Sequence, residues 1–76
     1  MERFNEIACE VLKLSPEEIK DSLTPKDVPD WDSMNYLLFI SALEKHFNIS
    51  FTMDEVLNAG SLGDVKTILR AKGITE

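Results

Sequence analysis

The chain has 76 residues and a formal net charge of −6, with 43% hydrophobic and 29% charged residues. A chain of this size supports one small domain, so residues 1–76 are expected to fold together without a deep active-site cleft. The acidic balance disfavours nucleic acid as a partner, because phosphates would repel the domain. The negative charge favours partners with basic surfaces, although a need for solubility would explain the same charge equally well. These bounds suit a binding module, carrier or adaptor better than an autonomous enzyme.

The sequence carries no sign of a secretory or membrane setting. Cys9 is the single cysteine, so an internal disulfide is impossible, and no CxxC or Cys/His cluster suggests a metal. The sequence shows neither a signal-peptide pattern at its start nor an apolar run of membrane-spanning length. We therefore expect a cytoplasmic, reduced and monomeric protein without metal or membrane insertion. Met1 and the compact limits favour a free-standing chain.

Residues 2–13 are expected to form the first helix, because apolar residues recur there at helical spacing. The apolar side consists of Phe4, Ile7, Ala8, Val11 and Leu12. Cys9 lies beside this stripe and is interpreted as a structural residue, since no cationic neighbour is evident that would lower its pKa.

A long ordered loop is expected between the first helix and the next. Ser15, Pro16 and Glu18 form a helix-start signal, but Thr24-Pro25 limits it to a short turn. The stretch 21–32 then mixes polar residues and prolines with a few apolar ones. Its predicted anchors to the core are Leu23, Val28 and Trp31. A loop of this length in a small domain is usually functional.

The second helix is predicted over residues 33–47, with Asp32 as its N-cap and Asn48 as the left-handed residue that ends it. Its core face should contain Tyr36, Ile40, Leu43 and Phe47, flanked by Leu37 and Phe39. The opposite side collects Asn35, Leu38, Ala42 and Lys45, with Met34 near its edge. Exposed Leu38 and Met34 so close to Ser33 predict a docking surface, because apolar patches on small domains often mark partner sites.

Two further helices complete the expected fold. Thr52 and Glu55 form a capping box that opens a short helix, with Val56 and Leu57 predicted to face inward. Ser61 should cap a last helix, which Gly73 ends. The apolar stripe of that helix is Leu62, Val65, Ile68 and Leu69. The predicted fold class is all-α: a small four-helix bundle with three main helices, one short helix and a long first loop.

Ser33, at the mouth of the second helix, is the candidate functional residue. A self-activated nucleophile needs a base within hydrogen-bond reach. His46, the single histidine, lies 13 residues further along the same helix, roughly 20 Å away at 1.5 Å per residue, so a hydrolase is excluded. The unpaired amides at a helix start attract phosphate, and a phosphodiester on Ser33 would be stabilised there. The alternative is that Asp32 and Ser33 serve only as helix caps.

The motif Asp32-Ser33-Met34 and the apolar pattern that follows it resemble the acyl carrier protein family, in which an Asp-Ser-Leu motif opens the second helix. The resemblance covers essentially the whole chain, including the ALEKHFNISF exit from the second helix and the final SLGDVKTIL helix. It implies a four-helix carrier fold in which Ser33 receives 4′-phosphopantetheine from coenzyme A. A separate, magnesium-dependent phosphopantetheinyl transferase would perform that reaction, with Asp32 as N-cap and recognition residue.

The resemblance also implies a role for the attached arm. Its thiol would hold an acyl or aminoacyl group as a thioester and carry it from a loading enzyme to condensing, tailoring or transfer enzymes. The domain itself would catalyse nothing. The alternative reading is an unmodified helical interaction module with a carrier-like fold.

Several positions depart from the pattern of fatty-acid carriers. Met34 replaces the commoner leucine, Trp31 stands where a small residue is usual, and Asn35 and Leu38 occupy places that are usually acidic. The remaining acidic residues of that face are Asp30, Asp32, Glu44, Asp54 and Glu55. These departures favour a carrier in a secondary-metabolite, polyketide, peptide or cell-envelope pathway. The predicted docking residues are Trp31, Met34, Asn35, Leu38, Asp54 and Glu55.

Overall fold

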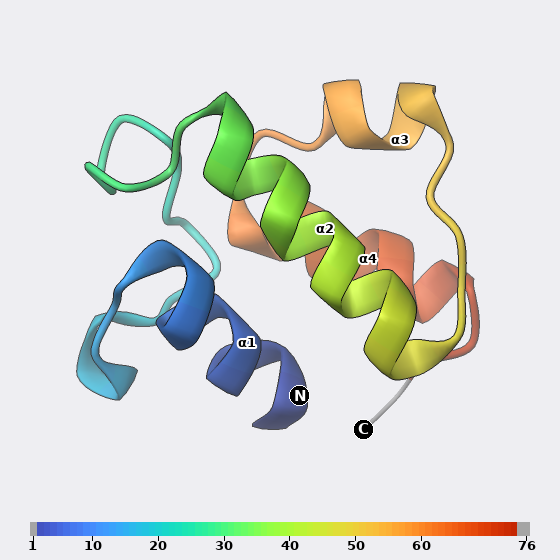
Figure 1. Cartoon of the computed structure of the whole chain (residues 1–76), viewed down its shortest axis with the longest axis horizontal. Helices are drawn as coiled ribbons and strands as arrows, with labels where there is room; N and C mark the ends of the chain where they lie inside the picture. The colour runs from blue at the N-terminus through green and yellow to red at the C-terminus, as the bar shows by residue number, and fades with distance from the viewer. Residues whose placement is uncertain (1, 75–76) are drawn as a thin grey trace.

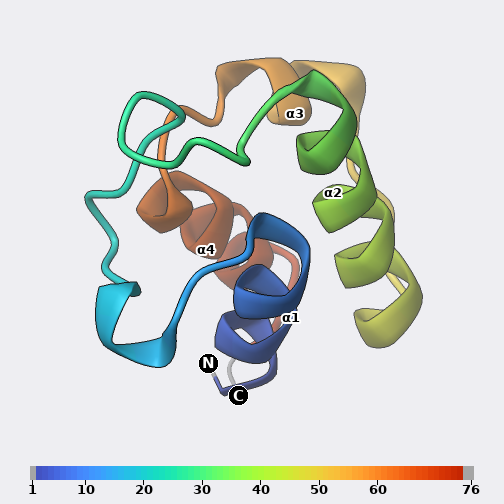
Figure 2. The same ribbon diagram turned by 60° about the vertical axis from the view of Figure 1, so that its left-hand side comes forward.

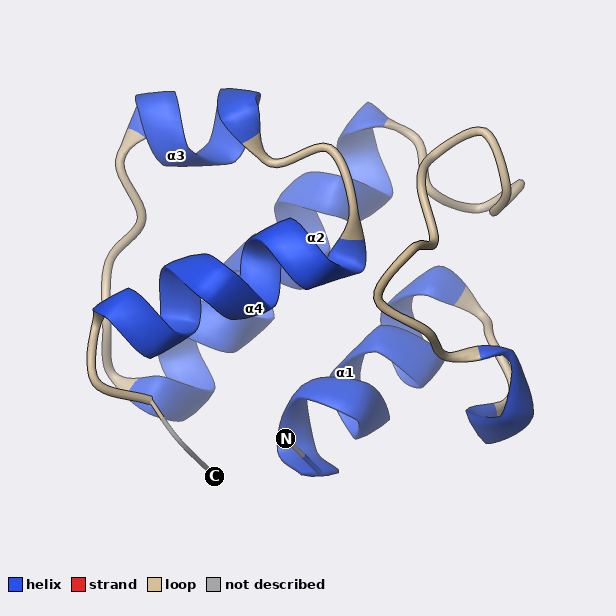
Figure 3. Cartoon of the chain, turned by 180° about the vertical axis from the view of Figure 1, so that it is seen from behind, coloured by secondary structure: helices blue, strands red, loops and turns tan. Residues whose placement is uncertain are grey.

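A computed structural model of the chain describes residues 2–74, and within that range it contains helices and loops but no strand. The elements in chain order are α1 (Glu2–Leu12), the 3₁₀ turn η1 (Pro16–Glu18), α2 (Ser33–Phe47), α3 (Met53–Asn58) and α4 (Leu62–Ala71). Figure 1 shows α2 crossing in front of α4. The short α3 lies above both helices in this view. Figure 3 shows the same arrangement from behind. The predicted all-α, four-helix architecture is confirmed.

The core is built from three helices and the long first loop. Its buried residues are Phe4, Ala8, Leu12, Leu23, Val28, Trp31, Phe39, Ile40, Leu43, Leu62, Val65 and Leu69. The rings of Phe4 in α1 and Phe39 in α2 meet edge to face, with centroids 5.4 Å apart. The ammonium of Lys66 in α4 lies 5.4 Å from the Phe4 ring centroid. Phe4 therefore joins α1 to both other main helices. Figure 2 shows the ribbons of α1, α2 and α4 from another side.

The long loop is ordered because its first half is fixed to the start of α4. The amides of Leu62 and Gly63 donate to the carbonyls of Leu23 and Asp21 at 3.1 and 2.9 Å. A Cβ on Gly63 would lie 3.0 Å from the Cβ of Asp21, so this close approach requires glycine. Lys66 pairs with the Asp21 carboxylate at 2.8 Å. Burial of Leu23, Val28 and Trp31 confirms the predicted anchors.

Two leucines lie elsewhere than predicted. Leu37, placed beside the core face of α2, is 57% exposed, and Leu57, placed inward on α3, is 72% exposed. The buried face of α2 is narrow, since its buried residues are Phe39, Ile40 and Leu43. Helix α3 has only six residues and packs on the core through Val56, followed by Ala59 just after its end. Both outer leucines are therefore left in solvent.

Within residues 2–74, no helix has the length and apolar character needed to cross a membrane.

Candidate functional site

Ser33 is the first residue of α2, and its position follows from local capping chemistry. The Asp32 carboxylate accepts a hydrogen bond from the Asn35 amide at 2.8 Å, which confirms Asp32 as the N-cap. At the other end of the helix, Asn48 has φ 57° and ψ 51°, the left-handed conformation that was predicted. Ser33 itself is exposed. The helix therefore begins and ends as expected, with the serine hydroxyl at its mouth.

The surroundings of Ser33 suit an attached phosphodiester. Among the described residues 2–74, the Ser33 hydroxyl makes no hydrogen bond, so it is open to an external enzyme. Asp32 engages the Asn35 amide, which leaves the amides of Ser33 and Met34 as donors at the positive end of the α2 dipole. An exposed hydroxyl beside two such donors fits the attachment of 4′-phosphopantetheine.

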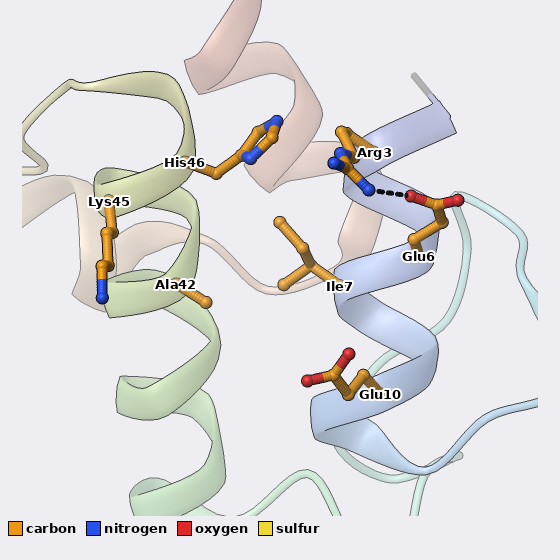
Figure 4. Close-up of a pocket in the computed structure, with 7 residues that line it drawn as sticks. All are labelled: Arg3, Glu6, Ile7, Glu10, Ala42, Lys45 and His46. Carbon is orange, nitrogen blue, oxygen red and sulfur yellow. Dashed lines mark hydrogen bonds and ion pairs between the residues drawn. The ribbon is translucent and has the colours of Figure 1, made fainter.

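His46 lies on α2 far from this serine and cannot act as its base. It lines an open groove of about 680 Å³ between α1 and α2, together with Arg3, Glu6, Ile7, Glu10, Ala42 and Lys45. Figure 4 shows α1 and α2 supplying opposite walls of this groove, with the Arg3–Glu6 ion pair at 2.7 Å on the α1 side. Ala42, expected on the outward side of α2, is half-buried here. The groove is therefore separate from the candidate site.

Neither metal binding nor thiol chemistry is indicated for the described residues. Within residues 2–74, no three His, Cys, Asp or Glu side chains gather closely enough to hold a metal ion. Burial raises the pKa of the Cys9 thiol, and the nearby charge of Glu18 raises it further. A raised pKa disfavours the reactive thiolate.

The loop before Ser33 is tied to α2, and α2 is tied in turn to α3. The side-chain amide of Asn35 donates to the Asp30 carbonyl at 2.7 Å. The Trp31 and Tyr36 rings pack with centroids 5.8 Å apart. The Tyr36 hydroxyl donates to the Val56 carbonyl at 2.8 Å and so links the start of α2 to α3. The sequence placed Tyr36 only on the core face and did not reveal its bond to Val56. No local pattern signals a hydrogen bond between residues 20 positions apart.

Five large apolar side chains are exposed on α2 and α3, and we call them the apolar set. Its members are Met34, Leu37, Leu38, Met53 and Leu57, which are exposed by 54% or more. The predicted exposure of Met34 and Leu38 is confirmed. Exposed apolar side chains on the helix that begins at Ser33, and on the helix bonded to it through Tyr36, suit contact with a partner protein.

The other predicted docking residues divide into two groups. Asp54 is exposed, whereas the Glu55 carboxylate accepts from the Thr52 amide at 2.8 Å and pairs with Lys72 at 3.0 Å. The Thr52 amide, followed by Lys72, lowers the pKa of Glu55. Asn35 is half-buried and bonded to the loop. Glu55 and Asn35 are therefore already engaged within the domain.

Trp31 was also predicted to belong to the docking surface, but in the structure its side chain is buried. Only 6% of its surface is exposed, because it packs into the core next to Tyr36. Trp31 therefore supports the loop and offers little area to a partner.

Comparison with known proteins gives a match along most of the chain. The family model described as the phosphopantetheine attachment site matches residues 2–69. A solved structure described as a "putative acyl carrier protein" from Mycobacterium tuberculosis superposes with a TM-score of 0.83. The two chains are 24% identical, and the match covers 93% of this chain and 95% of that one. This likeness concerns the fold. No curated protein sequence matches the chain significantly.

Proposed function

Because the chain belongs to the phosphopantetheine attachment site family and is a carrier protein, we propose that Ser33 holds the prosthetic group. The group of this family is covalently attached 4′-phosphopantetheine. The observation that supports Ser33 is its exposed position at the first residue of α2, next to the N-cap Asp32. The unpaired amides at the start of α2 would stabilise the negative charge of the phosphodiester.

In this proposal the chain is a substrate and not a catalyst. A separate phosphopantetheinyl transferase, with magnesium, joins the Ser33 oxygen to the phosphorus of the arm and releases the nucleotide half of coenzyme A. When bound, the arm supplies a terminal thiol that holds an acyl or aminoacyl group as a thioester. The residues around Ser33 fix the attachment point, and loading, condensing, tailoring or transfer enzymes act on the cargo.

Partner enzymes are proposed to dock on the apolar set and on Asp54. An enzyme that acts on the thiol must approach Ser33, and Met34, Leu37 and Leu38 lie within two turns of it on α2. Two of the acidic groups predicted for this face, Glu55 and Glu44, are engaged: Glu55 with Lys72, and Glu44 with the Phe51 amide at 2.8 Å. Apolar contact therefore contributes more to the proposed docking than charge does, which fits a specialised pathway better than general fatty-acid synthesis.

The attachment residue is tested by the intact mass of the protein after incubation with coenzyme A, magnesium and a phosphopantetheinyl transferase of broad specificity. We expect the wild type to gain one phosphopantetheine and Ser33→Ala to gain none. Ser41→Ala is the matched control, since Ser41 is also exposed on α2 and should leave the mass gain unchanged. A gain in Ser33→Ala, or none in folded wild type with several transferases, would contradict the assignment.

A further inference from the structure

A hollow of about 320 Å³ opens beside Ser33 on the side of the long loop. It is lined by Pro25, Trp31, Asp32, Ser33 and Tyr36. None of the apolar set lines it. At about 100° per residue, Tyr36 lies roughly 60° to one side of Ser33, whereas Met34 and Leu38 lie roughly 100° and 140° to the other. The hollow and the apolar residues of α2 therefore flank the serine on opposite sides.

The walls of this hollow are held in place by bonds within the domain. The Tyr36 hydroxyl is fixed by the Val56 carbonyl at 2.8 Å, and its ring packs against Trp31. The Trp31 amide donates to the Val28 carbonyl at 3.0 Å. A pre-formed site costs little conformational entropy when it is filled.

Pro25 is likewise held, because it lies in a turn closed by its neighbours. The amide and the hydroxyl of Thr24 both donate to the Asp27 carboxylate at 3.1 Å, and the Asp27 amide donates to the Thr24 carbonyl at 2.9 Å. Pro25 therefore keeps its place in the lining that it shares with Trp31 and Tyr36.

The lining is chemically suited to one part of the prosthetic group. Pro25 and the two aromatic rings are apolar, while Asp32 adds a carboxylate whose Oδ1 accepts from the Asn35 amide. The first segment of the arm after the phosphate is the pantoyl unit, which has two geminal methyl groups beside a hydroxyl and an amide. Methyl groups suit the apolar rings, and the hydroxyl or amide N–H suits the remaining oxygen of Asp32.

We infer that this hollow receives the pantoyl segment of the arm when no partner enzyme is bound. The inference rests on the proposed attachment at Ser33, since the first segment of an arm joined there begins beside a hollow that the serine itself lines. Held on the loop side, the arm leaves Met34 and Leu38 uncovered for docking. Trp31, which lines the hollow, then contacts the arm through the small part of its side chain that stays exposed.

Isotope-filtered NMR of the modified protein tests this inference. The wild type is labelled with ¹³C and ¹⁵N, converted with unlabelled coenzyme A, and its mass gain is confirmed before the spectra are recorded. We expect nuclear Overhauser contacts from the geminal methyls to ring protons of Trp31 and Pro25, and a shifted Trp31 indole N–H relative to the unmodified protein. A mass gain with contacts only to Met34 or Leu38, or with none, overturns the inference and leaves Ser33 as the attachment residue. An absent mass gain overturns both.

Two proline variants provide a matched comparison. Pro25 lines the hollow, whereas Pro29 is exposed in the same loop and does not. Pro25→Ala should lose most of the indole shift, while Pro29→Ala should keep it. Equal loss in both variants would mean that the shift reports a general change of the loop. If Pro25→Ala fails to fold, the methyl contacts of the wild type alone decide.

Discussion

The Tyr36 hydroxyl, one turn into α2, donates a hydrogen bond of 2.8 Å to the carbonyl of Val56 in α3. That carbonyl is one of the last four of α3, which have no partner within the helix. A six-residue helix has little stability of its own, so a bond from a neighbouring element matters. Tyr36 thus helps to hold α3 near the start of α2.

Replacing Tyr36 with phenylalanine should lower the free energy of unfolding by about 1 kcal/mol, because the half-buried Val56 carbonyl loses its donor. The measurement is urea unfolding followed by circular dichroism at neutral pH. Helix content before unfolding should stay close to that of the wild type, since the ring remains. A variant as stable as the wild type would show that water replaces the hydroxyl fully.

Alkaline pH should also weaken the fold through Tyr36. Burial of its hydroxyl, and secondarily the charge of Asp64, raises its pKa in the folded protein. Below the unfolded pKa of about 10, both states keep the proton. Above it the unfolded chain loses the proton first, so stability falls as pH rises toward the folded pKa.

The wild type and Tyr36→Phe should therefore converge in stability between about pH 9 and about pH 11. Urea midpoints of the two proteins at each pH provide the measurement, because titrating lysines affect both alike. A constant difference across that range would mean that Tyr36 has an ordinary pKa.

Asp32→Ala should lower the free energy of unfolding by about 1 kcal/mol, because α2 loses its N-cap bond to the Asn35 amide. Asp32→Asn is the matched control, since its side-chain oxygen still accepts that bond. It should recover most of the loss in thermal or urea unfolding. Equal losses in both variants would indicate that the charge of Asp32, and not its cap, stabilises the helix.

Ser33→Ala should change the free energy of unfolding by less than about 0.5 kcal/mol, because Ser33 is exposed and its hydroxyl lies outside the core. Circular dichroism and a urea titration check this. A collapse of helix content would mean that the hydroxyl is structural and would contradict a role confined to attachment.

Leu38→Asp should slow a partner reaction, such as transfer of the arm from coenzyme A, far more than it lowers stability. Leu38 is 54% exposed, so the stability loss should stay near 0.5 kcal/mol, about the helix-propensity difference. Ser41→Asp introduces the same charge at an exposed position about 12 Å from Ser33 along α2, which is about 4.5 Å beyond Leu38. Equal slowing by both variants would point to the added charge and not to the loss of an apolar contact.

The helix ends, and with them the position of Ser33 at the start of α2, were predictable because they depend on local chemistry. Asp32, Thr52 and Ser61 cap their helices through side chains that reach only three residues ahead. The family resemblance, carried by the motif at Ser33, gave the carrier function that the family match supports. These features needed no knowledge of tertiary packing.

The surface around the site was less predictable, because it depends on how the elements pack. A helical wheel could not show that α3 lies with Leu57 outward, or that Leu37 falls beyond the narrow buried face of α2. Trp31 became a core residue because the loop folds back onto Tyr36. Glu55 formed an ion pair with Lys72, which lies 17 positions away in the sequence. Each of these outcomes depends on contacts between distant segments.

The chain has one tryptophan and one tyrosine, and their rings lie 5.8 Å apart beside Ser33. Its intrinsic fluorescence therefore reports on a single corner of the molecule. An unfolding curve followed by indole emission measures the release of the loop from α2, whereas the far-ultraviolet signal measures the helices as a whole. The two curves coincide only where the loop and the bundle unfold as one cooperative unit.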